Sequence, residues 1–183
     1  VAGLAPQTPS DSSEFGILAN QGARIDGFTI VGSNNGGGIV VNGYAQDLQI
    51  GNNRLTGNAG IYGGGIRVGH PALSHEVIDP ADPLGAIGDI VYDDATNDRI
   101  RIHHNQIIKN GGQGGAGGGI SLHTGADDYK VQNNWVCGNF TQGDGAGIGH
   151  LGLSDNGLME DNVVAFNESF SQGSAVDGGG IFI

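Results

Sequence analysis

The stretch IRIHHNQIIKNGGQGGAGGGI, residues 100–120, contains the two patterns that decide the fold of this chain. Its first half sets two asparagines five positions apart, Asn105 and Asn110, among short apolar segments. Its second half is rich in glycine and ends in the step Gly119-Ile120. Both patterns recur along the chain, so the stretch is one copy of an internal repeat.

The asparagine pattern has four regular copies, LQIGNNRLTGN (48–58), IRIHHNQIIKN (100–110), YKVQNNWVCGN (129–139) and LMEDNVVAFN (158–167). In each copy an apolar residue stands three positions before the first asparagine and another two positions after it. A degenerate copy, IDGFTIVGS (25–33), has Phe28 at the position of the first asparagine. The first asparagines of the regular copies are Asn53, Asn105, Asn134 and Asn162.

A Gly-Ile step marks the repeat a second time, at Gly16-Ile17, Gly38-Ile39, Gly65-Ile66, Gly119-Ile120, Gly147-Ile148 and Gly180-Ile181. Each unit therefore holds three short apolar segments between Gly and Asn corners, too short for helices and too regular for loops. Such units bury their apolar residues by stacking, with equivalent positions about 4.8 Å apart. We predict an all-β parallel coil, a solenoid with three strands per turn and about six turns. Stacked asparagines are expected to bond to one another at its corners.

The composition limits the class of protein. Glycine accounts for 37 of 183 residues, and there is no Gly-X-Y period of the collagen type. Lys and Arg total 7 against 19 Asp and Glu, a net charge of −12, which argues against a nucleic-acid partner. Cys137 is the only cysteine, so no internal disulfide can form. No apolar run approaches the roughly 20 residues of a membrane span.

The repeat resembles the right-handed parallel β-helix of the pectate-lyase superfamily, from about residue 14 to the end of the chain. The Gly-Gly-Gly-Ile steps are also similar to those of autotransporter and polymorphic outer-membrane passengers. We take residues 1–13 as a lead-in or the end of a preceding turn and residues 14–183 as the β-helix. Because the chain ends in GGGIFI, we expect it to be a segment of a longer coil. The resemblance implies a secreted or cell-surface location.

One long insertion interrupts the repeat. Only one asparagine copy lies between Ile66 and Ile120, so a single turn carries an excursion over residues 70–97. Long loops in a compact repeat are often functional or form interfaces. The alternative, a loop that covers a strand face, stays open. His70 and His75 lie in this insertion and, with His123, are candidates for a transition-metal site, although no His-x-x-His or Cys-x-x-Cys spacing is present.

Stacking converts the repeat into columns of outward side chains. Arg67, Ser121 and His123 are expected on the outer face of the Gly-Ile strands, forming a cleft beside the insertion that binds a sugar or a cation, or else an inert solvent face. A serine and a histidine two positions apart do not define a hydrolase by spacing alone. Trp135 is expected to point outward, aligned with Arg54, and could stack on a sugar ring.

Aspartates form a second column, Asp98, Asp127 and Asp155, with Asp128 beside it. Carboxylates about 5 Å apart repel unless a cation bridges them, so the column predicts calcium, with solvated turn residues as the alternative. The resemblance also implies calcium beside an Arg or Lys base, since many pectate lyases are built in this way. The stacked pair Arg101 and Lys130 are therefore weak catalytic candidates, together with Arg67 and His123.

Two classes of function follow. The first is an extracellular or cell-surface module with a structural, adhesive or glycan-binding role, whose partners are polysaccharides or other segments of the same β-helix. The second is a lyase or hydrolase of acidic polysaccharides. Regular short corners and the scarcity of cationic and aromatic residues on the expected cleft favour the first class. The fold resemblance and the aspartate column favour the second.

Overall fold

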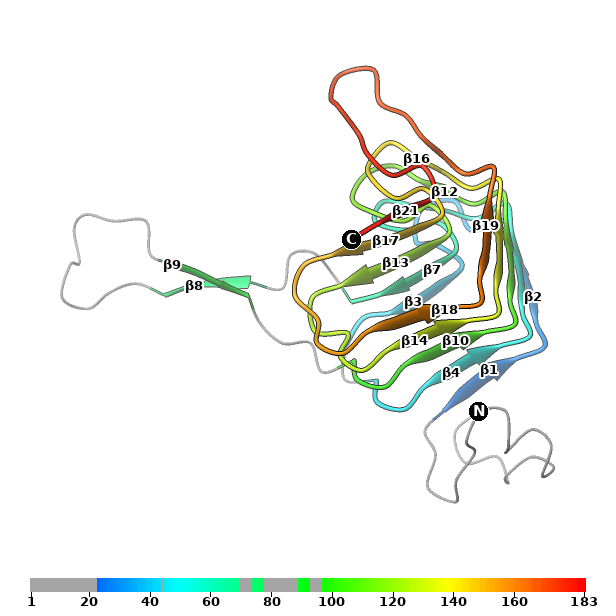
Figure 1. Ribbon diagram of the computed structural model, residues 1–183, viewed down its shortest axis with the longest axis horizontal. Coiled ribbons are helices and arrows are strands. Elements are labelled where there is room, and N and C mark those ends of the chain that lie inside the picture. The colour runs from blue at the N-terminus through cyan, green and yellow to red at the C-terminus, as the bar shows by residue number, and fades with distance from the viewer. Residues whose placement is uncertain (1–22, 44, 70–73, 78–88, 93–96) are drawn as a thin grey trace.

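The computed structural model describes residues 23–43, 45–69, 74–77, 89–92 and 97–183. These residues form a parallel β-coil of about five turns, in which each turn lies directly on the one before it (Figure 1). Four parallel sheets run along the coil. We name them A to D in the order in which each full turn of the chain passes through them. A separate antiparallel hairpin extends away from the coil (Figure 1).

Each sheet collects one strand from successive turns. Sheet A contains β1 (Arg24–Asp26), β4 (Gln49–Gly51), β10 (Arg101–His103), β14 (Lys130–Gln132) and β18 (Leu158–Glu160). Sheet B contains β2 (Thr29–Val31), β5 (Arg54–Thr56), β11 (Gln106–Ile108), β15 (Trp135–Cys137) and β19 (Val163–Ala165). Sheet C contains β6 (Ala59–Gly60), β12 (Gly111–Gly112), β16 (Phe140–Thr141) and β20 (Glu168–Ser169). Sheet D contains β3 (Ile39–Val41), β7 (Ile66–Val68), β13 (Ile120–His123), β17 (Ile148–Leu151) and β21 (Ile181–Phe182).

The predicted parallel coil and its register are confirmed, and two details differ. Each turn after the first has a fourth strand, in sheet C, where three were expected. These strands are two residues long and one of them is Gly111-Gly112, so they carry no apolar period that a sequence pattern could reveal. The expected first Gly-Ile step, Gly16-Ile17, lies outside the described residues, which leaves about five turns.

The core is a stack of aliphatic side chains from sheets A, B and D. In sheets A and B the middle residue of each strand points inward, as do Ile102 and Ile107 in the third turn. In sheet D the inward residues alternate with outward ones, so Ile120 and Leu122 are buried together. The period of two places only one or two side chains per strand in the core, which is why the strands can be so short.

Corners between the sheets bend through left-handed residues that are themselves stacked. After sheet A the column consists of Asn52, His104, Asn133 and Asp161, all with φ between 53° and 55°. A second column follows sheet B, at Gly57, Lys109, Gly138 and Phe166. A left-handed residue reverses the chain over few bonds, and asparagine and glycine adopt this conformation at low cost.

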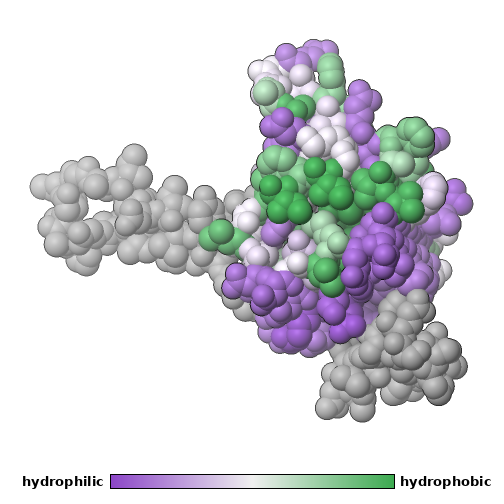
Figure 2. Space-filling view, viewed as in Figure 1, coloured by the Kyte–Doolittle hydropathy of each residue, from purple (hydrophilic) through white to green (hydrophobic). Residues whose placement is uncertain are grey.

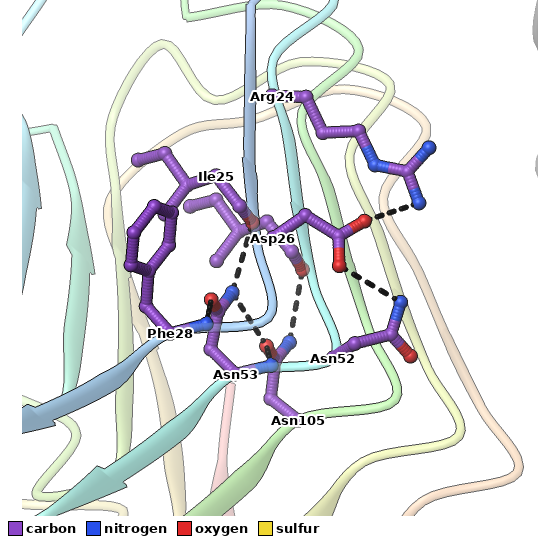
Figure 3. Close-up of polar contacts among 8 residues, drawn as sticks. Arg24, Ile25, Asp26, Phe28, Asn52, Asn53 and Asn105 are labelled. Atoms are coloured by element: carbon purple, nitrogen blue, oxygen red, sulfur yellow. Dashed lines mark hydrogen bonds and ion pairs between the residues drawn. The ribbon is translucent and has the colours of Figure 1, made fainter. Parts of the chain in front are cut away.

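An asparagine ladder runs through the corner between sheets A and B. The Asn105 Oδ1 accepts hydrogen bonds from the Asn53 backbone N–H and side-chain amide, at 2.9 and 3.1 Å (Figure 3). The Asn105 Nδ2 donates to the carbonyl of Ile50 at 2.9 Å and to the Oδ1 of Asn134 at 3.0 Å. The buried amide of Asn105 is thus hydrogen-bonded to the preceding turn and to the following turn.

The second asparagine of each repeat forms a parallel ladder between sheets B and C. Asn110 accepts from the Asn58 backbone and side chain and donates to Asn139, which in turn donates to Asn167. At the start of both ladders the chain has other residues: the Phe28 N–H donates to Asn53 and the Ser33 N–H donates to Asn58. The predicted ladder of Asn53, Asn105, Asn134 and Asn162 is therefore confirmed, and a second one accompanies it.

The insertion contains β8 (Ser74–Val77) and β9 (Asp89–Tyr92), which pair antiparallel and form the hairpin. The remainder of residues 70–96 lies outside the described part of the chain. No helix long and apolar enough to cross a membrane is found among the described residues.

Replacing Asn105 by alanine is expected to lower the free energy of unfolding by about 3 kcal/mol or more. The substitution leaves the partners of the amide in Asn53, Ile50 and Asn134 without hydrogen bonds in a dry corner, at about 1–3 kcal/mol each. Urea titration followed by circular dichroism measures the loss. Gln106→Ala, one residue along on an exposed site, is the control and should cost less than about 0.5 kcal/mol. Equal losses in the two variants would contradict the ladder's role.

Candidate functional site

The column of Arg67, Ser121 and His123 lies on the outer side of sheet D. Arg67 pairs with Ser121 across the neighbouring strands β7 and β13, as the repeat predicts. Ser121 Oγ is 2.8 Å from His123 Nε2, and the imidazole meets the ring of Tyr62 edge-on, with centroids 6.4 Å apart. The structure therefore brings these three residues together.

Their expected accessibility is wrong, because the side chains of Ser121 and His123 are completely buried. The glycine-rich corners that contain Gly63 and Gly117, before β7 and β13, fold back over the outer face of the sheet. A Cβ atom added to Gly63 would lie 2.9 Å from the Ser121 Cβ, and one added to Gly117 would lie 2.7 Å from its Cα. Burial also lowers the pKa of the Arg67 guanidinium from its usual value. The predicted open cleft is thus a covered, hydrogen-bonded surface.

The predicted column of Asp98, Asp127 and Asp155 has the expected register. The Arg99 N–H donates to the carbonyl of Asp127, and the Asp128 N–H donates to the carbonyl of Asp155, both at 2.8 Å. Two of the carboxylates accept hydrogen bonds from within the protein. Asp98 accepts from the Gln46 amide at 3.3 Å, and Asp127 accepts from the Asp155 backbone N–H at 2.7 Å.

A neighbouring column of the same corner carries an ion pair. Arg99 donates two hydrogen bonds to Asp47, at 2.7 and 2.9 Å, and this holds the pKa of the Asp47 carboxyl below its usual value. Within the described ranges, no three His, Cys, Asp or Glu side chains are grouped so as to hold a metal ion. Calcium at the aspartate column stays a prediction, and it would have to compete with these protein donors.

The remaining candidates are spread over different faces. Arg101 and Lys130 are register partners on β10 and β14, on the outer side of sheet A, where Figure 2 shows a hydrophilic surface. They therefore lie on a different sheet from Arg67 and His123. His75 belongs to β8 and pairs with Val91 of β9, whereas His70 lies outside the described residues.

Sheet B presents the most open regular face. Trp135 stands in register between Gln106 and Val163, and its residue is 47% exposed while the adjacent Val136 is fully buried. Arg54 continues the same exposed column beyond Gln106. Lys109, at the left-handed corner that borders this face, is exposed as well. The predicted outward position of Trp135 is confirmed.

Sequence analysis missed a cavity next to sheet C. It has a volume of about 560 Å³ and is lined by Phe140, Gln142, Phe170, Ser171, Gln172 and Gly173. Phe140 belongs to a sheet C strand, and the other lining residues follow sheet C strands in two successive turns. Because sheet C was not expected, no alignment of the repeat could bring these residues together. The signal in the sequence that could have indicated this cavity was the pair Phe140 and Phe170 among polar residues and glycine.

A buried histidine lies on the outer side of sheet A. His103 is 2% exposed, and its ring occupies the space above Gly51, where any side chain would collide with it. Burial lowers the pKa of His103 to about 3, with further contributions from the positive charges of His104, Arg24 and Arg101. The ring is therefore neutral in the folded protein at physiological pH.

No protein-family model, no curated protein and no solved structure matches this chain. The fold and the site thus define a class, a parallel β-solenoid with two asparagine ladders. The finer resemblance to the pectate-lyase superfamily stays a prediction.

His103 is expected to make the protein less stable in acid. An unfolded histidine with a pKa of about 6.5 takes up a proton that the folded ring resists, so stability is complete above pH 6.5 and falls as the pH approaches 3. Between pH 7 and 4.5 the free energy of unfolding should fall by about 2–3 kcal/mol more in the wild type than in His103→Gln. Urea titrations at both pH values measure this, and parallel losses would refute it.

Proposed function

We propose that this protein is a non-enzymatic, secreted or cell-surface β-solenoid module that binds an extended polysaccharide along the outer face of sheet B. The observation that carries the proposal is the exposed indole of Trp135 on this flat face. An aromatic ring of this size is usually buried, and its apolar face offers a platform for the C–H face of a sugar ring.

The neighbours of Trp135 supply the polar contacts that a sugar needs. Gln106 and Arg54 stand one and two turns away in the same outward column, so their donors are spaced about 4.8 Å apart along the coil. Lys109 adds a third donor at the border of the face. A ligand chain that runs parallel to the coil axis could contact all of them in succession, which favours a polymer over a single sugar.

The placement of the catalytic candidates supports a binding role. Arg67 and His123 lie on sheet D, where His123 is buried beneath a glycine corner, and Arg101 and Lys130 lie on sheet A. An enzyme needs its acid, base and substrate within hydrogen-bond reach of one another. The four candidates are not assembled in this way within the described part of the chain.

Trp135→Ala is expected to weaken polysaccharide binding at least tenfold without unfolding the protein, because the side chain is exposed and its removal leaves no core cavity. Trp135 is the only tryptophan, so a glycan titration of wild-type protein read by intrinsic fluorescence reports directly on this face. Calorimetry against a panel of neutral and acidic polysaccharides should show at least a tenfold loss of affinity in the variant. Ile61→Ala, which removes another exposed apolar side chain away from sheet B, should bind normally. An affinity that is unchanged in Trp135→Ala would refute the proposal.

A second candidate function is a polysaccharide lyase, favoured by the adjacency of Arg101 and Lys130 on sheet A and the aspartate corner that precedes them. The resemblance implies this combination of carboxylates and a basic residue. Absorbance assays for an unsaturated product on acidic polysaccharides, with and without Ca²⁺, test it. Product release that is lost in Lys130→Ala would establish a lyase and overturn the non-enzymatic proposal.

Calcium at the aspartate corner has its own test. A bound ion would raise the melting temperature when CaCl₂ is added, and Asp127→Asn should remove that increase. The asparagine can still accept the hydrogen bond from the Asp155 N–H, so the variant removes charge and little else. An unchanged melting temperature in CaCl₂ and in EDTA would assign these aspartates to hydrogen bonding alone.

A further inference from the structure

The outer face of sheet C carries a cavity that the proposed function does not use. Thr141 points into the core and is completely buried, so its neighbours Phe140 and Gln142 lie on the outer face of the sheet. Phe170 follows β20, and its N–H donates to the Thr141 carbonyl at 3.0 Å, which continues the sheet register beside Gln142. The cavity therefore lies on the side of the coil and is lined by two successive turns.

A long corner forms one wall of this cavity. After β20 the chain runs over residues 170–180 before it enters β21, whereas the corresponding corners of the two preceding turns comprise residues 113–119 and 142–147. Figure 1 shows the long corner, in orange to red, extending away from the coil. Ser171, Gln172 and Gly173 belong to this corner and line the cavity. The cavity thus depends on a local lengthening of the repeat.

Hydrogen bonds hold the backbone on both sides of the cavity. In the long corner, Ser171 Oγ accepts from the Gly173 N–H at 3.3 Å and lies 3.1 Å from Ser174 Oγ. In the preceding turn, Thr141 Oγ1 accepts from the Gly143 N–H at 3.1 Å. A site that is largely formed before the ligand arrives loses little conformational entropy on binding.

The lining residues combine aromatic rings with neutral polar groups. Phe140 and Phe170 supply the rings, while Gln142, Gln172 and Ser171 supply groups that can both donate and accept hydrogen bonds. A sugar unit has the complementary surface, because its C–H faces pack on aromatic rings and its hydroxyls both donate and accept. The chemistry of the lining therefore fits a carbohydrate.

The charges at this site disfavour an acidic ligand. None of the described residues that line the cavity is ionisable, so no lining cation would balance a carboxylate or a sulfate. Glu168 is the register partner of Phe140 and is exposed on the same sheet. A negative ligand beside Glu168 would be repelled, and the net charge of −12 adds to this repulsion.

We propose that this cavity binds one or two units of a neutral sugar. Its volume of about 560 Å³ is within the range of about 300–1,000 Å³ that is usual for ligand sites. The rings of Phe140 and Phe170 pack against the C–H faces, and the two glutamine side chains bind the hydroxyls. The site lies on a different sheet from Trp135, so the proposal does not depend on glycan binding to sheet B.

Nuclear magnetic resonance titration of the full chain with maltose, cellobiose and lactose tests the site. At least one of these neutral disaccharides should cause saturable shifts of the side-chain amide signals of Gln142 and Gln172. Digalacturonate is the acidic probe and should bind at least tenfold more weakly than the best neutral disaccharide, because Glu168 repels it.

Gln142→Ala and Gln113→Ala form a matched pair. Gln113 follows Gly112, the register partner of Thr141, so it occupies the same exposed column one turn earlier but does not line the cavity. Gln142→Ala should weaken disaccharide binding at least fivefold, whereas Gln113→Ala should leave the affinity unchanged. Both variants should keep the wild-type melting temperature, because both side chains are exposed.

Phe140→Leu keeps an apolar side chain but removes the flat ring, and it should also weaken disaccharide binding at least fivefold. No saturable binding of any of the three disaccharides, equal losses in the two glutamine variants, or digalacturonate binding as tight as that of the neutral sugars would each overturn the proposal. Disaccharide binding that is lost in Trp135→Ala and kept in Gln142→Ala would also overturn it and assign the sugar to sheet B. Either carbohydrate site can therefore fail its test without the other.

Discussion

The hydrogen bond from one asparagine side chain to the next is the interaction on which the rest of this structure depends. In the corners after sheets A and B, a buried amide bonds to a backbone carbonyl of the preceding turn and to the asparagines of the preceding and following turns. A corner shifted by one residue would bury these amides without partners. The ladders therefore hold all turns in one register, and the register places every outward side chain in a column.

The columns differ in their solvent exposure because the corners beside them differ. Short asparagine corners leave sheet B open, and Trp135 lies exposed there. The glycine corners before sheet D are longer, and they fold over its outer face and bury Ser121 and His123. The same repeat thus produces one exposed face and one closed face.

Much of this arrangement could be predicted from the sequence. The spacing of Asn105 and Asn110 indicated the stacked corners, and the alignment of Trp135 with Gln106 and Val163 is the register of sheet B. The adjacency of Arg101 and Lys130 followed from the same alignment. The cavity beside Phe140 could not be predicted, because the two-residue strands of sheet C carry no pattern.

The sequence by itself determined the coil, its ladders and the members of each column, because these depend on a periodic pattern that every turn repeats. Only the tertiary structure decided which columns reach solvent. The exposure of a column depends on where the neighbouring glycine corner lies in space. Because glycines have no side chain, the sequence contains no periodic pattern that shows which surface they cover. Ser121 and Trp135 both point outward from their strands, and the fold of the neighbouring corner makes one buried and the other exposed.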